Sequence, residues 1–241
     1  MSICALCCEP AELQDSHVIP EFLYEPLYDA IHRFQVYQVS GEVQRKFNQK
    51  GLREKMLCSG CEQQIAKYER YVSLLFEGRT SAAARAINDV VVVSPINYRS
   101  LRLFLLSILW RSGVSKQQFF SRVSLGRHEE ELRKMLLAEE VAPNWRYGCM
   151  LSAPLLNGEP QFDLMLQPTE VRVDGYRVYR YLFGGLHWSF FAASHPHPKG
   201  LEVLSLDGST DLRILRTDFR DMKYAEDTFR KVAAYKRDPD L

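Results

Sequence analysis

The sequence predicts an α+β protein in two parts, and three observations support this fold class. Two CxxC pairs, Cys4/Cys7 and Cys58/Cys61, enclose the first quarter of the chain. Apolar residues recur at helical spacing in the middle of the chain, and short runs rich in β-branched and aromatic residues follow after residue 148. We therefore expect a small unit over residues 1–78, built around the cysteine pairs, and a mixed domain of helices and an antiparallel sheet over residues 79–241.

The composition is that of an ordinary globular protein. The chain has 241 residues, of which 46% are hydrophobic and 25% charged, and its formal net charge is +1. So small a charge gives no overall attraction to nucleic acid or to an anionic membrane, and any such attraction must be local. The N-terminus has no apolar signal core, and no run reaches the roughly 18 apolar residues of a membrane span. We expect a cytoplasmic protein with no membrane partner.

The spacing of the cysteines indicates a metal site. Each CxxC turn places two thiolates on one side of a tight turn, and two such turns together offer the tetrahedral sulfur set that suits structural Zn²⁺. Disulfides are the first alternative, although a reducing compartment disfavours them. The second alternative is an iron site for electron transfer, which would give the fifty-residue insert between the pairs no role. Cys8 could replace its neighbour Cys7 as a ligand, and Cys149, in an apolar run, is expected to be a small buried residue.

The insert and the segment after it carry further candidate residues. "ELQDSHVIP" predicts a short strand that ends at Pro20 and presents Asp15 and His17 on one face. "CEQQIAKYERYVSLLF" predicts a helix that has Glu62 in its first turn and Glu69 two turns further on. Between them lies a basic stretch, which we predict to bind the phosphate backbone of nucleic acid: Arg45, Lys46, Lys50, Arg53 and Lys55.

The order of these features resembles the treble-clef, ββα-metal HNH endonuclease family over about residues 4–72. The shared features are a CxxC pair, a His followed by an apolar residue and Pro, and a second CxxC pair that opens a helix. The resemblance implies that His17 is the general base that activates water for attack on a phosphodiester. It also implies that Glu62 binds a catalytic divalent ion, and a carboxylate ligand suits Mg²⁺ or Mn²⁺.

The sequence departs from this family at two positions. Ser16 stands where the family commonly has an Asp that binds the ion; the acid is Asp15, which could serve only if the chain bends there. Arg53 stands five residues before Cys58, where we expect an Asn, and the nearest Asn is Asn48. The chain is thus either a divergent active member or a zinc fold that has lost its chemistry.

Two classes of function follow. The first is a metal-dependent endonuclease that acts on nucleic acid, DNA in preference to RNA, with His17 as base and Glu62 and Asp15 as acidic residues. A role in bacterial defence against foreign DNA would suit this architecture by analogy. The second is a non-catalytic, zinc-stapled adapter that binds a protein or a nucleic acid. In that case His17 is a hydrogen-bonded structural residue, and Glu62 is an acidic residue that the helix macrodipole favours at the N-terminus. The basic stretch is then a solvated hairpin.

The expected elements of residues 79–241 are read from periodicity and turn residues. We expect a connection with a short helix over 78–89, a strand at 90–94, a buried helix at 97–113, and helices at 115–123 and 127–140. Strands follow at 148–156, 161–167, 171–183 with an Asp-Gly turn, 186–194, 201–207 and 212–218, before a helix at about 218–235.

The second part carries no catalytic motif. Arginines alternate with aromatic residues between positions 172 and 188, either as a surface that stacks on bases and binds phosphates or as the two faces of a half-buried hairpin. "HPHP" at 195–198 is expected to be a rigid turn. The HNH resemblance implies that residues 79–241 choose the target or a protein partner.

Overall fold

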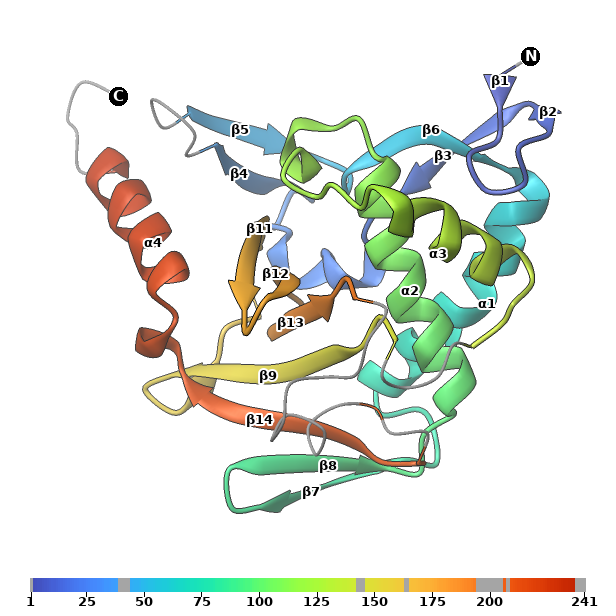
Figure 1. Cartoon of the computed structure of the whole chain (residues 1–241). Coiled ribbons are helices and arrows are strands. Elements are labelled where there is room, and N and C mark those ends of the chain that lie inside the picture. Colours follow the sequence, from blue (N-terminus) through green and yellow to red (C-terminus); the bar gives the residue numbers. More distant parts are fainter. Residues whose placement is uncertain are drawn as a thin grey trace.

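A computed structural model describes residues 2–38, 44–141, 146–162, 165–193, 206 and 209–236. Figure 1 shows a large sheet beside a group of helices, with small two-stranded sheets above them. The predicted α+β class is confirmed at the level of mixed helices and sheets. The predicted strand at 201–207 lies outside the described residues except for Leu206, and so does the HPHP turn.

The first part of the chain is a set of short strands that leads into one long helix. Strand β3 pairs antiparallel with β6, which runs directly into helix α1, and Pro20 follows the end of β3 as predicted. The helix buries one stripe of side chains at helical spacing, from Cys61 through Ile65 and Tyr68 to Val72. The bounds are β1 Ser2–Ile3, β2 Pro10–Ala11, β3 Leu13–His17, β4 Phe34–Gln38, β5 Gln44–Asn48, β6 Arg53–Cys58 and α1 Ser59–Phe76, with single 3₁₀ turns at Glu21–Leu23 and Glu25–Leu27.

The large sheet has eight strands in the order β11-β12-β13-β9-β14-β8-β7, with β10 paired to β9. Their bounds are β7 Ala83–Ile87, β8 Val90–Ser94, β9 Cys149–Leu156, β10 Glu159–Pro160, β11 Leu166–Val173, β12 Tyr176–Phe183, β13 Leu186–Phe191 and β14 Leu212–Asp218. The prediction of an antiparallel sheet is wrong at one pair, because β14 runs parallel to β9. Strand β14, the last in the sequence, lies between β9 and β8, and no local sequence pattern predicts such a pairing.

The predicted short helix over 78–89 is wrong. Residues Ala83–Ile87 form β7, an edge strand that pairs with β8 through a tight turn at Asn88 and Asp89. Asn88 has φ +51°, a conformation that asparagine tolerates in such turns. The alanine-rich segment could form a helix, but pairing with the neighbouring Val-rich strand decides its conformation.

The remaining helices follow the sequence pattern more closely. Helix α2 (Tyr98–Val114) begins at Asn97, whose side chain accepts a hydrogen bond from the Ser100 N–H, and it is buried without a break from Leu101 to Ser112. Helix α3 spans Arg127–Leu137 and α4 spans Lys223–Lys236, after a 3₁₀ turn at Phe219–Asp221. The helix predicted over 115–123 is reduced to one 3₁₀ turn at Gln118–Phe120. None of the described helices is long and apolar enough to cross a bilayer.

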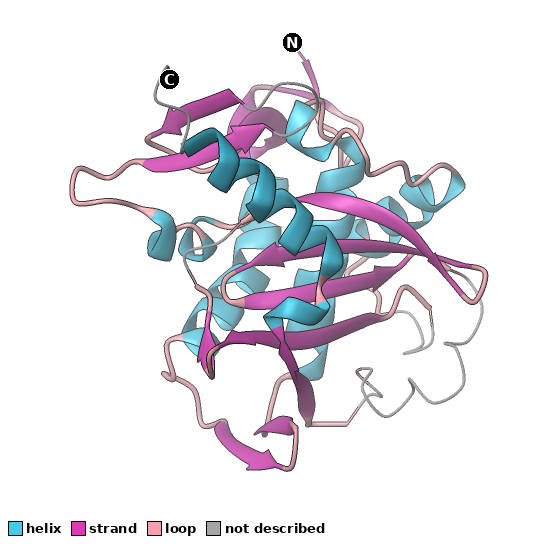
Figure 2. Ribbon diagram, turned by 90° about the vertical axis from the view of Figure 1, so that its left-hand side faces the viewer, coloured by secondary structure: helices cyan, strands magenta, loops and turns pink. Residues whose placement is uncertain are grey.

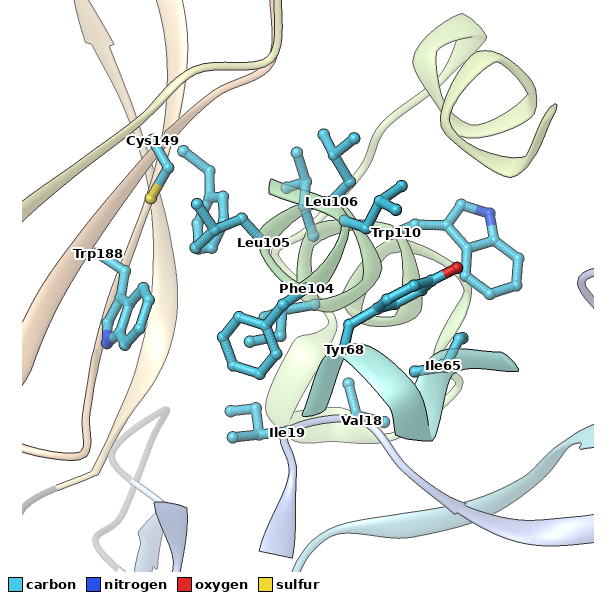
Figure 3. Packing of buried hydrophobic residues seen from close by; sticks show 14 of the residues in the cluster. Val18, Ile19, Ile65, Tyr68, Phe104, Leu105, Leu106, Trp110, Cys149 and Trp188 are labelled. Carbon is cyan, nitrogen blue, oxygen red and sulfur yellow. The ribbon is translucent and has the colours of Figure 1, made fainter. Parts of the chain in front are cut away.

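One cluster of buried side chains runs through both predicted parts of the chain. Figure 3 shows α2 at its centre, with Phe104 and Trp110 directed outward among neighbours from α1, the β3 end and the sheet. Ile65 and Tyr68 contribute from α1, and Trp188 contributes from β13. A smaller cluster lies where α4 begins (Leu182, Phe219, Met222 and Ala225), and Figure 2 shows α4 in front of the sheet with the other helices behind it. The cysteine-containing unit is therefore packed on the same core as the sheet.

Candidate metal centre and the polar cluster at His17

The two predicted cysteine pairs come together. Cys4 and Cys7 lie in the turn between β1 and β2, Cys58 ends β6, and Cys61 lies in the first turn of α1. The four Sγ atoms all lie within 4.8 Å of one another, and those of Cys7 and Cys58 are 3.9 Å apart. A tetrahedron with Zn–S bonds of about 2.3 Å has edges of about 3.8 Å. The sulfur set therefore fits a zinc ion, and Cys8, exposed with φ +62°, is not part of it.

Hydrogen bonds favour the thiolate of Cys4, whereas burial raises the pKa of Cys7. Burial acts to raise the pKa of the Cys4 thiol, but backbone N–H groups, including that of Cys58 at 3.3 Å, prevail and bring the pKa to about 7. Burial and the neighbouring sulfurs raise the pKa of Cys61. A divalent cation would supply the positive charge that allows all four sulfurs to ionise together. Cys149, as expected, is buried apart from this group, in β9.

His17 lies in a cluster of charged side chains at the other end of β3. Its Nε2 accepts a hydrogen bond from Arg53 Nε (2.7 Å), the residue opposite it in β6, and lies 2.5 Å from Glu21 Oε2. Tyr28 Oη donates to the other oxygen of Glu21 at 2.6 Å. The side chain of His17 is 18% exposed. The imidazole is thus held between a cation and an anion.

A buried arginine joins this cluster to the helices. Arg111 of α2 is 1% exposed; its Nη1 donates to the backbone oxygen of His17 at 2.6 Å, and its Nη2 lies 2.6 Å from Glu69 Oε1 on α1. Ser107, one turn earlier, accepts from the same guanidinium through its backbone oxygen and its hydroxyl. Arg111 therefore fixes the position of the backbone that carries His17.

These surroundings keep the imidazole neutral. Burial lowers the pKa of His17, and the charge of Arg53 lowers it further, while Glu21 and Glu69 act in the opposite direction. For Glu21, burial acts to raise the pKa, but the hydrogen bond from Tyr28 and the contacts with His17 and Arg53 lower it. Near neutral pH the cluster then contains an uncharged imidazole beside an ionised carboxylate, which is the state that a general base requires.

The other predicted catalytic residues lie at two places. Asp15 shares the His17 face of β3, and its Oδ2 is 3.8 Å from Arg53 Nη1. Glu62 lies next to Cys61 in the first turn of α1, and none of the contacts described for His17 involves it. Its Oε1 is buried, and no described residue hydrogen bonds to it. Ser16 is buried, and its Oγ accepts from the Leu57 N–H at 3.2 Å, so an acid there would lie inside the fold.

Sequence reasoning missed Glu21, Tyr28 and Arg111, and it noted Glu69 only as a second acid on the helix. Glu21 follows Pro20 in a 3₁₀ turn, and no strand or helix period relates it to His17. Arg111 lies in the most apolar helix, where its charge predicts exposure. A carboxylate two turns along α1 from Glu62 was the one signal that pointed to Glu69.

The five predicted phosphate-binding residues separate into two groups. Arg45, Lys46 and Lys50 are exposed on the β4–β5 hairpin and just after it, and Arg45 lies 5.3 Å from the centre of the half-exposed Phe47 ring. Arg53 is directed to His17, and Lys55 Nζ donates to the Leu13 backbone oxygen at 3.1 Å. The hairpin residues and Lys55 are therefore exposed, and Arg53 belongs to the His17 cluster.

Comparison with known proteins adds no family. No family model, no curated protein and no solved structure matches this chain. The functional argument therefore rests on the residues and their geometry.

Proposed function

We propose that this chain is a metal-dependent endonuclease that hydrolyses phosphodiester bonds of nucleic acid, DNA in preference to RNA. The observation that carries the proposal is the cluster at His17, where a neutral imidazole lies between Glu21 and Arg53 at one end of the β3–β6 pair. The four-cysteine group lies at the other end of the same pair. This arrangement supports the HNH-like, treble-clef interpretation of the sequence.

The cysteine group has a structural role in this proposal. Cys4, Cys7, Cys58 and Cys61 would hold a zinc ion that joins the β1–β2 turn to the start of α1. The unit has few long strands, and bound zinc adds its binding free energy to the stability of the fold. The fixed helix start in turn determines where Glu62 and Glu69 lie.

His17 acts as the base, and Arg53 holds the substrate. In this structure Nε2 accepts the Arg53 N–H and also lies 2.5 Å from Glu21 Oε2, so Arg53 has to move to the phosphate and Glu21 has to turn away from Nε2 before it can accept a proton from water. Arginine is suited to this exchange because its guanidinium binds phosphate through two parallel hydrogen bonds. Glu21 then stabilises the imidazolium, and the exposed residues of the β4–β5 hairpin hold the neighbouring phosphates.

Two carboxylates are candidates to hold the catalytic Mg²⁺ or Mn²⁺. Glu62 has a buried oxygen that no described residue hydrogen bonds, as a ligand position requires, and Asp15 lies half-exposed on the His17 face. Oxygen ligands of this kind suit both ions. The bound ion would neutralise the charge that builds up on the phosphate during attack.

The test is a plasmid-nicking assay with Mg²⁺ or Mn²⁺ and the His17→Asn variant. Loss of a general base lowers the rate by about 10²–10⁴-fold. The control is the fold of the variant itself, because His17→Asn should retain the circular dichroism spectrum and the zinc content of the parent. Cleavage by His17→Asn at the parent rate would remove His17 from the mechanism. Glu62→Gln and Asp15→Asn should raise the concentration of Mg²⁺ or Mn²⁺ needed for half-maximal cleavage.

One observation favours a second function, a zinc-stapled adapter without catalysis. The ion pairs around His17 are complete, since Arg53 occupies Nε2 and also lies 3.8 Å from both Asp15 and Glu21. An adapter would contain zinc and bind a protein or duplex DNA, yet it would leave the plasmid intact with either ion. Its binding would be unaffected by His17→Asn.

A further inference from the structure

A pocket of about 300 Å³ lies in the part of the chain that the nuclease proposal does not use. It opens between the start of α3 and the β11–β12 hairpin, with the end of β13 beside them. Its volume is at the lower end of the range for small-molecule sites. Its lining combines apolar, small and positively charged residues, and the ones that carry the argument are Gly126, Arg127, His128, Arg172, Gly175 and Arg177.

Three arginines supply the charge of this pocket, and among the described residues no aspartate or glutamate lines it. Arg177 Nη1 donates to the Ser124 backbone oxygen at 2.9 Å, and its Nε lies 3.3 Å from Glu170 Oε1. Arg172 Nη1 donates to the Gly175 backbone oxygen at 3.3 Å. For Arg127 no carboxylate partner is described. A guanidinium has five N–H donors, so each arginine retains donors for a ligand.

The backbone leaves the pocket open and adds to its positive potential. Gly126 and Gly175 have φ +55° and +83°, and a Cβ atom on either would meet no atom within 4 Å. Gly126 precedes the first turn of α3, where no side chain caps the helix. The N–H groups of His128 and Glu129 already donate to the backbone oxygens of Leu125 and Gly126, so the helix start contributes the general positive potential of its dipole. This feature reinforces the arginines and would carry no argument without them.

His128 is part of the pocket lining. Its Nδ1 lies 2.9 Å from Tyr147 Oη, and its side chain is 12% exposed. Burial lowers its pKa; Glu131 acts in the opposite direction, and the charges of Arg127, Arg177 and Arg146 lower it further. Arg127 and Arg177 line the same pocket as this half-buried imidazole, so their charges lie on one side of the ligand space.

We propose that this pocket binds the phosphate monoester group of a small ligand of the size of a sugar phosphate or mononucleotide. A phosphate monoester carries close to two negative charges and has three acceptor oxygens, which matches several convergent guanidinium groups better than a single carboxylate does. The proposal is independent of cleavage at His17. A free nucleotide and the 5′-phosphorylated end of an oligonucleotide both present this chemistry.

Calorimetric titration of the full chain tests the site with adenosine 5′-monophosphate, adenosine and malonate as probes. We expect saturable binding of the monophosphate and none of adenosine. Arg127→Gln and Arg172→Gln, both at exposed positions, should each weaken binding roughly tenfold or more. Arg85→Gln is the matched control, because Arg85 is an exposed arginine on β7 outside the pocket. A 5′-phosphorylated oligonucleotide that binds as tightly as the monophosphate would identify a nucleic-acid end as the source, and weaker binding would identify a free nucleotide.

Three results would overturn the proposal. The first is that the monophosphate shows no saturable binding, or that malonate binds as tightly as the monophosphate. The second is an equal loss of affinity in Arg85→Gln, because that would indicate a general attraction of anions. The third comes from NMR of the histidine side chains: binding that shifts the signals of His17 or His32 but not those of His128 places the ligand elsewhere.

Discussion

Replacing Glu69 with glutamine should destabilise the whole protein, because Glu69 neutralises a buried arginine that links α1, α2 and the His17 backbone. Arg111 is 1% exposed, and Glu69 is the carboxylate described next to it, at 2.6 Å. Glu69→Gln keeps a hydrogen-bond acceptor and nearly the same volume. The substitution therefore removes the negative charge and little else.

The magnitude follows from the burial of the pair. Leaving one partner of a fully buried ion pair uncompensated costs about 3–5 kcal/mol. Glu69 is 22% exposed, so water screens part of the interaction, and Arg111 keeps its hydrogen bonds to Ser107 and His17. We expect a loss of about 2 kcal/mol in the free energy of unfolding, or roughly 4–8 °C in Tm for a chain of this length.

Urea denaturation followed by tryptophan fluorescence measures this loss. The control is Glu77→Gln, at the C-terminal end of the same helix, where Glu77 is 44% exposed and pairs with Arg79 on the surface. That pair should contribute less than about 1 kcal/mol. If Glu69→Gln and Glu77→Gln unfold at the same urea concentration as the parent, the charge of Arg111 does not depend on Glu69, and the proposed link is refuted.

Three further predictions concern the metal, the packing and the pH dependence. Metal analysis should find one zinc ion per chain in the parent and in Cys8→Ser, and none in Cys58→Ser. Equal zinc content in the two variants would contradict the assigned ligand set. Gly113→Ala should destabilise the protein by about 1–3 kcal/mol, because its Cβ would lie 2.2 Å from a buried leucine side chain. Gly60→Ala has open space around its Cβ and should stabilise the protein by about 0.5–1 kcal/mol. If both substitutions change the free energy of unfolding in the same direction, the described packing at Gly113 is refuted. Burial lowers the pKa of His187 from 6.5 to about 4, so between these pH values the unfolded chain binds more protons than the folded one. The free energy of unfolding therefore falls as the pH drops through this range, by up to about 3 kcal/mol. His187→Gln should flatten the plot of unfolding free energy against pH in this range, and an unchanged slope would contradict the assignment to His187.

Local spacing in the sequence was sufficient to predict the cysteine group and most of the elements. The Cys4/Cys7 and Cys58/Cys61 pairs meet because each CxxC turn presents two sulfurs on one side, wherever the chain between them goes. Helices α1 and α2 and the β11–β12 hairpin follow from periods and turn residues that lie within a few positions of one another.

Only the tertiary structure decided which charged groups surround His17 and how the sheet is ordered. Glu21 and Arg53 reach His17 through a 3₁₀ turn and a strand register, and Arg111 reaches it from a helix 94 residues later. Strand β14 lies between β9 and β8 because burial favours that long-range pairing. Periodicity records which face of an element is buried, but the partner on that face is selected by the free energy of the assembled core, to which residues distant in sequence contribute together.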